Sequence, residues 1–280
     1  MSTSHSTAHG SHKDRPYRLG IAFSGGGARG LAHAGALMAI EEAGLKPDIV
    51  AGVSAGSVIA VLYAAGMRPI DMATMFARSN FRKLTELSYG GGGIFKIERF
   101  GRFILDALDS LGGMRCIEDL HIPTYIGVTD LDNARSVAFC EGEILPRMLA
   151  SCSIPVIFPP VNINGVNYVD GGVLRNLPAW VLRDKCDTLI GINVSPILPK
   201  KEHKTLVQVA YRSYHMMLKA NQVDDMAMCD VAVQTDDLTD YQVFDLRHIK
   251  QMVVSGYIHT RRALEKAGMW NPSTTDKSSK

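Results

Sequence analysis

Two strand-to-helix turns near the start of the chain carry residue types that suit acyl transfer. The second turn has the pattern Gly52-x-Ser54-x-Gly56 and follows an apolar run at residues 49–53. Glycines two positions before and after a serine remove the side chains that would collide with a sharp turn, and such a turn presents the serine Oγ outward. Ser54 is therefore the candidate nucleophile.

The first turn is rich in glycine and offers backbone amides instead of a side chain. After an apolar run at residues 19–23, it reads Gly25, Gly26, Gly27, Ala28, Arg29 and Gly30. Successive glycines let N–H groups converge on one point, and the helix that begins there adds a partial positive charge. We expect an oxyanion hole built from the backbone at residues 25–28, namely Gly25, Gly26, Gly27 and Ala28.

A candidate base lies in Asp170-Gly171-Gly172, which follows a short predicted strand at residues 166–169. An unperturbed carboxylate with a pKa near 4 is a poor acceptor for a serine proton. Partial burial of Asp170 would raise that pKa, and a direct hydrogen bond with Ser54 Oγ would reduce the mismatch further. The sequence thus predicts that Asp170 is the general base.

The three motifs, in this order and spacing, resemble those of the patatin-like phospholipases, and the resemblance covers roughly residues 18–195. It implies a three-layer α/β/α fold with a mostly parallel central sheet and a Ser–Asp dyad in place of a triad. It also implies a lipase or phospholipase that cleaves fatty acyl esters of phospholipids or lysophospholipids through an acyl-enzyme, with no metal or cofactor. Supporting roles fall on Arg29, which would brace the glycine loop, and on Gly52, Gly56 and Gly171.

The elements that must position these residues alternate between apolar strand patterns and helical patterns, which predicts a parallel sheet with right-handed crossovers. The predicted strands are residues 19–23, 49–53, 125–130, 136–140, 166–169, 188–194 and 231–234. The predicted helices are residues 30–43, 55–65, 143–152, 204–228 and 246–266. Small residues on one side of the first helix predict close packing on the sheet. Both glycine turns fall at the carboxyl ends of strands, where open α/β sheets bind ligands.

A run of glycine at residues 90–93 precedes another helical pattern, whose apolar residues are Ile97, Phe100, Ile104, Leu108 and Leu111. This spacing is typical of a helix with one apolar face. Two interpretations stay open: the helix is docked on the core of its own domain, or it is a flap that hinges at the glycines and covers the active site.

The chain has 280 residues, of which 46% are hydrophobic, and this predicts one domain over residues 17–270 with disordered tails at residues 1–16 and 271–280. The resemblance implies that this is a hydrolase domain. The first tail lacks the apolar segment of a secretory signal. Five cysteines without a Cys-x-x-Cys pattern favour a reducing, cytoplasmic location. A net charge of +2 argues against nucleic-acid binding but permits transient contact with a membrane surface.

The uncharged run at residues 49–67 contains the Ser54 turn, so we expect a buried strand and helix there and no membrane span.

Three alternatives compete with the dyad. A Ser–Asp–His triad is available because His203, His215, His248 and His259 follow Asp170 in the sequence. The pattern Gly25-x-Gly27-x-x-Gly30 also suits a nucleotide, but the next strand ends in Ser54 and not in an acidic ribose ligand. The third alternative is a non-catalytic module on the same fold.

The preferred partner is a lipid or lysophospholipid substrate, and the sequence leaves the oligomeric state open.

Overall fold

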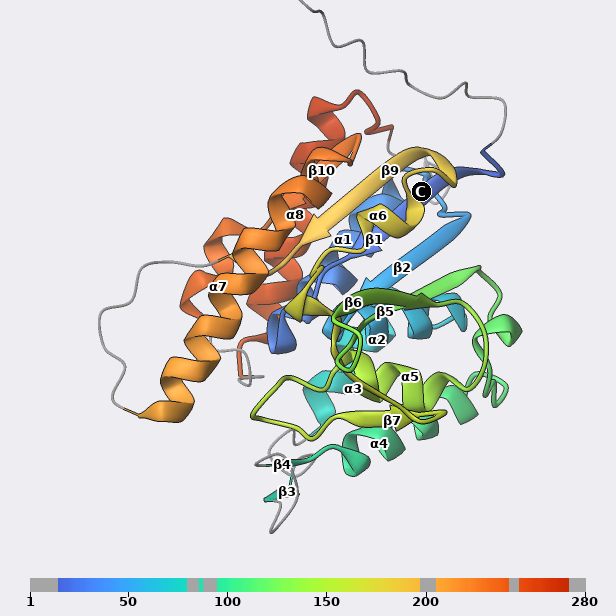
Figure 1. Cartoon of the computed structure of the whole chain (residues 1–280). Helices are drawn as coiled ribbons and strands as arrows, with labels where there is room; N and C mark the ends of the chain where they lie inside the picture. The colour runs from blue at the N-terminus through green and yellow to red at the C-terminus, as the bar shows by residue number, and fades with distance from the viewer. Residues whose placement is uncertain (1–14, 80–85, 88–94, 197–204, 242–246, 272–280) are drawn as a thin grey trace, which may run out of the picture.

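A computed structural model describes residues 15–79, 86–87, 95–196, 205–241 and 247–271 (Figure 1). The tails expected at the two ends lie almost wholly outside the described residues, and so does the glycine run at 90–93. The prediction of one domain over residues 17–270 stays a prediction.

The described residues form a mixed sheet of eight strands in the order β10-β9-β1-β2-β5-β8-β7, with β6 pairing with β5. The strands are β1 Tyr17–Phe23, β2 Ile49–Val53, β5 Thr124–Asp130, β6 Arg135–Phe139, β7 Val161–Ile163, β8 Val166–Asp170, β9 Cys186–Asn193 and β10 Val231–Gln234. The run from β10 to β5 is parallel, whereas β6, β7 and β8 pair antiparallel. The short strands β3 Glu86–Leu87 and β4 Phe95–Lys96 pair separately. The predicted mostly parallel sheet is confirmed.

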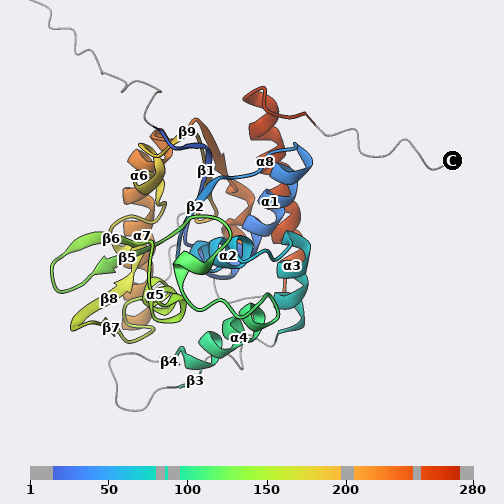
Figure 2. The same cartoon turned by 90° about the vertical axis from the view of Figure 1, so that its right-hand side faces the viewer.

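Helices cover both faces of this sheet, and Figure 2 shows α6 and α7 on one side with α1, α3 and α8 on the other. The helices are α1 Ala32–Glu42, α2 Ala55–Ala64, α3 Pro69–Arg78, α4 Glu98–Asp109, α5 Ile144–Ser151, α6 Ala179–Leu182, α7 Leu206–Ala227 and α8 Ile249–Lys266. Side chains of β1 alternate between two cores: Ile21 and Phe23 join the larger one, and Ala22 packs with Leu177 and Leu182 in the smaller one. The three-layer prediction is confirmed.

Glycines bring α1 close to another helix, α8. A Cβ atom at Gly35 would lie 1.8 Å from the Val253 carbonyl oxygen, and one at Gly256 would lie 1.8 Å from the Ala32 carbonyl oxygen. The glycines therefore let the backbones of α1 and α8 touch. The expectation of close packing on the sheet missed this helix partner, because the sequence does not say which surface a small residue faces.

The predicted helix at residues 97–111 appears as α4, and it is docked in this structure. Ile104 and Leu108 are fully buried, and Ile97 and Phe100 are nearly so. A Cβ atom at Gly101 would touch Leu145 of α5 at 3.0 Å. The docked interpretation describes this arrangement, and the hinged flap stays a prediction because residues 90–93 are outside the described part.

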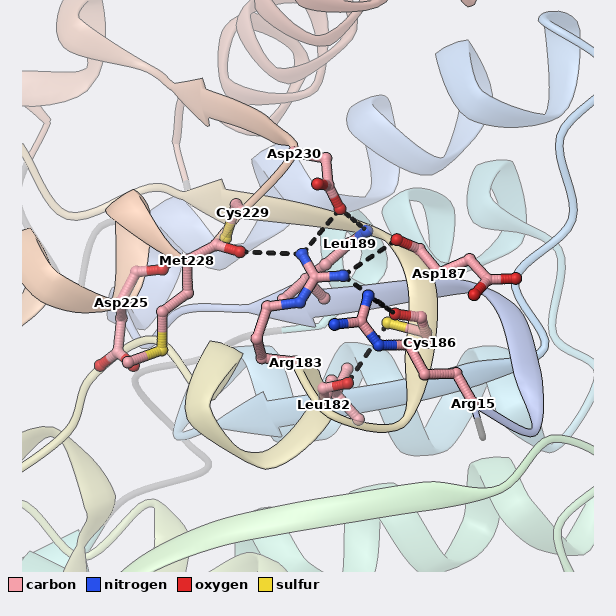
Figure 3. A network of polar contacts seen from close by, with 10 residues as sticks. All are labelled: Arg15, Leu182, Arg183, Cys186, Asp187, Leu189, Asp225, Met228, Cys229 and Asp230. Carbon is pink, nitrogen blue, oxygen red and sulfur yellow. Dashed lines mark hydrogen bonds and ion pairs between the residues drawn. The ribbon is translucent and has the colours of Figure 1, made fainter. Parts of the chain in front are cut away.

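At the amino end of β9, Arg183 ties three segments together (Figure 3). Its guanidinium donates to the carbonyl oxygens of Met228 at 3.0 Å and Cys186 at 2.9 Å, and to the Asp230 carboxylate at 2.7 Å. Asp230 also accepts the Leu189 amide at 2.7 Å. Arg183 thus joins the end of α6, the start of β9 and the turn between α7 and β10. They meet at the end of the sheet opposite the two glycine turns.

The uncharged run that begins at Ile49 forms β2 and α2, as predicted. Within the described ranges, no helix combines the length and apolar character needed to cross a bilayer.

Candidate active site

The turn between β2 and α2 holds Ser54 in an unusual backbone conformation, with φ 52° and ψ −126°. Such a conformation is sparsely populated by residues other than glycine and is commonly found at functional sites. A Cβ atom at Gly52 would lie 2.3 Å from the Gly56 carbonyl oxygen, and one at Gly56 would lie 2.3 Å from the Phe23 carbonyl oxygen. Only glycine fits at either position, so the packing of the turn accounts for both.

Two hydroxyl groups fix the backbone of this turn. The Ser54 amide donates to Ser151 Oγ at 2.8 Å, and Ser151 Oγ in turn donates to the Gly127 carbonyl at 2.7 Å. Ser57 Oγ donates to the Ser54 carbonyl at 2.6 Å. Ser151 was missed from the sequence because it lies 97 residues from Ser54 and carries no local motif.

Strand register brings Asp170 to the same place. Val53 of β2 pairs with Gly127 of β5, and the next residue of β5, Val128, pairs with Asp170 at the end of β8. Asp170 is completely buried, and its Oδ1 accepts the Gly172 amide at 2.8 Å. Within the described residues, Oδ2 has no partner at ordinary hydrogen-bond geometry. Catalytic hydrogen bonds are often long before substrate binds.

Burial raises the pKa of Asp170 to about 6. The Gly172 amide and the side chains of Ser54 and Tyr214 act in the opposite direction, because each favours the ionised carboxylate. The sequence predicted partial burial, and the burial is complete. Asp170 is thus a stronger base than a free aspartate and remains largely ionised at neutral pH.

Helix α7 supplies contacts to the Asp170 turn that the sequence did not reveal. Asn221 Nδ2 donates to the Gly172 carbonyl at 2.9 Å, and Asn221 Oδ1 accepts the Asn176 amide at 3.1 Å. A Cβ atom at Gly172 would lie 2.7 Å from the Tyr214 hydroxyl. Gly171 is equally restricted, since a Cβ atom there would lie 2.6 Å from the Gly127 carbonyl oxygen. The two glycines therefore make room for α7 and β5.

The glycine loop differs from its prediction at one residue. The Gly25 amide donates to the Asn176 carbonyl at 3.2 Å, so it is already engaged and we leave it out of the candidate oxyanion hole. The Gly25 carbonyl accepts Ser24 Oγ at 3.0 Å and Ser195 Oγ as well, which fixes the orientation of this peptide unit.

The next three amides of the loop remain available. A 3₁₀ helix spans Gly27–Leu31, and the first amides of a helix have no partner within it. Within the described residues, Gly26, Gly27 and Ala28 have no hydrogen-bond acceptor for their N–H groups. Gly27 and Ala28 line the same pocket as Ser54.

Arg29 and His33 brace the loop from behind. The buried Arg29 guanidinium donates to the carbonyls of Tyr241 at 2.9 Å and Pro196 at 3.1 Å. Burial lowers the pKa of His33 to about 4, so the ring is neutral and its Nε2–H donates to the Ser24 carbonyl at 2.8 Å. Neither side chain lines the pocket, and the supporting role of Arg29 stays a prediction.

An apolar pocket with a volume of about 80 Å³ is lined in part by Ser54. Its apolar lining includes Leu31, Val58, Ile59, Phe76, Ile97, Phe100, Ile154 and Phe158. Cys152 also lines it, and burial raises the pKa of this thiol, which keeps it neutral. Such a pocket suits a hydrocarbon chain next to the candidate nucleophile.

The histidines that follow Asp170 in the sequence are the candidates for a triad. Burial and the charges of nearby arginines lower the pKa of His215 to about 4, but His215 is not among the groups that act on Asp170. His259 pairs with Asp237 at 3.0 Å, and His203 is outside the described residues. In the described part of the chain, the groups that shift the pKa of Asp170 include no histidine. The choice between a dyad and a triad stays a prediction.

Comparison with known proteins gives a family model described as patatin-like phospholipase, which matches residues 21–183. "Lysophospholipase NTE1" of Saccharomyces cerevisiae is 31% identical over 186 residues, covering 63% of this chain and 11% of that protein. An "Uncharacterized NTE family protein" of Mycobacterium bovis is 35% identical over 165 residues, covering 58% of this chain and 44% of that protein. The match thus spans less than half the length of either relative.

The crystal structure of VipD from Legionella pneumophila is similar in fold, with a TM-score of 0.52 and 15% sequence identity, covering 90% of this chain and 67% of that chain.

Proposed function

Because the chain belongs to the patatin-like phospholipase family, we propose that it is a serine acyl hydrolase that cleaves fatty acyl esters of phospholipids or lysophospholipids. The observation that carries the proposal is the convergence of three features: Ser54 on its strained turn, the buried Asp170 that interacts with it, and the apolar pocket that begins at Ser54. The proposal includes a single hydrolase domain over residues 17–270 and, from the use of cysteine, a cytoplasmic location with transient contact at membranes.

In the proposed mechanism, Asp170 takes the hydroxyl proton of Ser54 as Ser54 Oγ attacks the ester carbonyl. The amides of Gly26, Gly27 and Ala28 stabilise the negative charge that develops on the carbonyl oxygen. Asp170 then returns the proton to the departing alcohol and leaves an acyl-enzyme. Asp170 next takes a proton from water as the water attacks that ester. It returns this proton to Ser54 Oγ as the bond to the acyl group breaks, which releases the fatty acid and restores the Ser54 hydroxyl.

The direction of the pKa shift of Asp170 supports this role. A base with a pKa near the working pH combines a high ionised fraction with a useful affinity for the proton. Asp170 meets both conditions at neutral pH, since burial raises its pKa to about 6.

The test is a set of single substitutions assayed with a short soluble ester and with a fluorophosphonate, which reacts with an activated serine. Ser54→Ala should abolish both reactions. Asp170→Asn should leave a folded protein whose turnover falls by several orders of magnitude, as when a base is lost from a serine site. Ser110→Ala, at the end of α4, is the matched control and should behave as the unchanged protein.

A different outcome would favour the alternatives. Loss of activity to the same depth on substitution of His203, His215, His248 or His259, without unfolding, would replace the dyad by a triad. No labelling of the unchanged protein would favour a non-catalytic module. Hydrolysis of lysophosphatidylcholine, phosphatidylcholine and triacylglycerol, measured side by side, then identifies the preferred lipid.

A further inference from the structure

Helix α7 has two faces with different surroundings. Its inner face contacts the sheet and the Asp170 turn: Asn221 donates to the Gly172 carbonyl, Gln222 accepts from Asn193 at 2.8 Å, and Asp225 pairs with Arg175 at 2.6 Å. Figure 1 shows α7 at the edge of the molecule, where its other face points away from the sheet.

The outer face carries a narrow apolar stripe along the whole helix. We call it the outer stripe and define it as Leu206, Val209, Ser213, Met216, Ala220, Val223 and Ala227. All seven residues are exposed, and the four large ones are between 46% and 84% exposed. Each is separated from the next by three or four positions in strict alternation.

This spacing points to another helix as the partner. Apolar residues that alternate at three and four positions repeat every seven, which is the seam of a coiled coil. A helix docked on a globular core has a wider apolar face. A helix that lies in a membrane surface has bulky aromatic or leucine side chains along its apolar face and a polar face rich in lysine and arginine. Three of the four alternate positions of the outer stripe carry small side chains, at Ser213, Ala220 and Ala227. Small side chains there let a second backbone approach closely.

We propose that the outer stripe pairs with the outer stripe of a second copy of this chain, with the two α7 helices parallel. A shared stripe makes the contact self-complementary, as a two-fold dimer requires. Charges at its flanks select the direction. Lys219 and Asp224 lie on opposite flanks, five residues apart, so in a parallel pair each Lys219 faces Asp224 of the second copy. In an antiparallel pair, Lys219 would face the like-charged Arg212.

Pairing also has a consequence for the active site. The inner face of α7 contacts the Gly172 carbonyl through Asn221 and Asp170 through Tyr214, so a second copy on the outer stripe would bind the helix that contacts the turn carrying the base. The proposed dimer contact and the contact with the Asp170 turn therefore lie on opposite faces of α7.

The first experiment measures molar mass by sedimentation across the micromolar range. The full chain should form a dimer, and Val209→Asp or Met216→Asp should weaken the association by at least about tenfold, because each places two carboxylates in the seam. Val254→Asp is the matched control, since Val254 of α8 is 47% exposed and Val209 is 46% exposed. It should leave the dimer intact. A monomer at every concentration, or equal weakening by Val254→Asp, would overturn the proposal.

The second experiment tests direction and partner. Lys219→Asp and Asp224→Lys should each weaken the dimer, and the double swap should restore it. If Lys219→Asp strengthens the dimer instead, the helices are antiparallel and the proposed direction is wrong. Sedimentation with phosphatidylcholine–phosphatidylglycerol vesicles provides the other arm. Monomeric protein that binds these vesicles through Met216 would make the outer stripe a lipid contact and refute pairing between copies.

Discussion

At the scale of single residues, the environment of Asp170 determines its basicity and the free energy needed to keep its carboxylate ionised in the folded protein. Removal from water disfavours the charged form and raises the pKa, whereas the Gly172 amide, Ser54 and Tyr214 favour the charged form. The balance leaves a pKa of about 6, between that of a free carboxylate and that of an imidazole. Two of these three favourable contacts follow from the fold alone, since Tyr214 and Ser54 lie far from Asp170 in the sequence.

Tyr214 lowers the pKa of Asp170, the proposed base, so we expect Tyr214→Phe to move the pH profile. In the unchanged protein, kcat/KM for a short ester should fall below pH 6 as Asp170 gains a proton. Loss of the hydroxyl removes a contact that lowers the pKa, so the acid limb should move to higher pH while activity above pH 8 changes little. A purely structural role would lower activity at every pH.

The control for this variant is Tyr63→Phe. Tyr63 donates to Glu41 at 3.0 Å on the surface of α1 and α2 and does not contact the site. Its profile should superimpose on that of the unchanged protein. An acid limb that stays in place in Tyr214→Phe, or that disappears in His215→Gln, would assign the ionisation to another group.

The same pKa shift makes Asp170→Asn a stabilising substitution above neutral pH. The pKa is raised from 3.8 to about 6 on folding, so between these values the native state binds more protons than the unfolded state. The free energy of unfolding therefore falls as pH rises through this window, and the ionised carboxylate costs about 2–3 kcal/mol above it. Asparagine does not ionise, so urea denaturation at pH 8 should show a gain that vanishes at pH 4. A loss at pH 8 would contradict the proposed burial cost.

At the scale of elements, contacts from later segments of the chain hold the glycine loop, whose amides are the proposed oxyanion donors. Its peptide at Gly25 is fixed by Asn176 and Ser195, and its arginine is fixed by carbonyls of later segments. Little space surrounds the next glycine: a Cβ atom at Gly26 would lie 2.7 Å from Val194 Cγ2. The loop can therefore keep its place only while this residue has no side chain.

We accordingly expect Gly26→Val to displace the loop and withdraw donors from the oxyanion. The kcat for a short ester should fall by roughly 10²–10³ for each effective donor lost, and KM should change less. Far-UV circular dichroism checks that the variant is folded. Unchanged kcat on a short ester would give the loop a role other than oxyanion stabilisation.

Helix α4 contributes to both the core and the pocket, and two of its residues separate these roles. Phe100 lines the pocket, whereas Ile104 is fully buried and does not. Phe100→Leu enlarges the pocket and should shift the preference among p-nitrophenyl esters toward longer acyl chains. Ile104→Val, the matched control, should cost about 0.5–1.5 kcal/mol of stability and leave that preference unchanged. An equal shift in both variants would mean that α4 acts through packing alone.

At the scale of the whole molecule, the sequence predicted the features that depend on neighbouring residues, namely the sharp turns and the strands before them. Gly52 and Gly56 could be recognised in the sequence because a sharp turn tolerates no side chain at these positions. Apolar runs revealed the strands that precede the turns. The contacts of Ser151, Tyr214 and Asn221 were not predictable. Each is an ordinary polar residue whose partner is chosen by strand register or helix packing, and a single sequence carries no signal for such long-range contacts.

The Gly25 amide shows that a single sequence also cannot reveal which groups of a motif are already hydrogen-bonded. A glycine-rich loop indicates that amides are available, but it does not say which of them the surrounding fold already uses. Here the Asn176 carbonyl, about 150 residues later in the chain, takes the Gly25 amide. Motif and spacing identified the loop, and tertiary contact determined its free donors.

The Arg183 cluster gives a prediction that concerns the stability of the molecule and not its chemistry. Arg183 is mostly buried and joins α6, β9 and the start of β10 at the end of the sheet remote from Ser54. Arg183→Ala removes hydrogen bonds to three carbonyls and to Asp230, so the free energy of unfolding should fall by about 2–4 kcal/mol. Arg68→Ala is the control, because Arg68 pairs with Asp71 in solvent and should leave the urea midpoint unchanged. The kcat of folded Arg183→Ala should equal that of the unchanged protein, and a large fall in kcat at low temperature, where the variant is folded, would show that the two ends of the sheet are coupled.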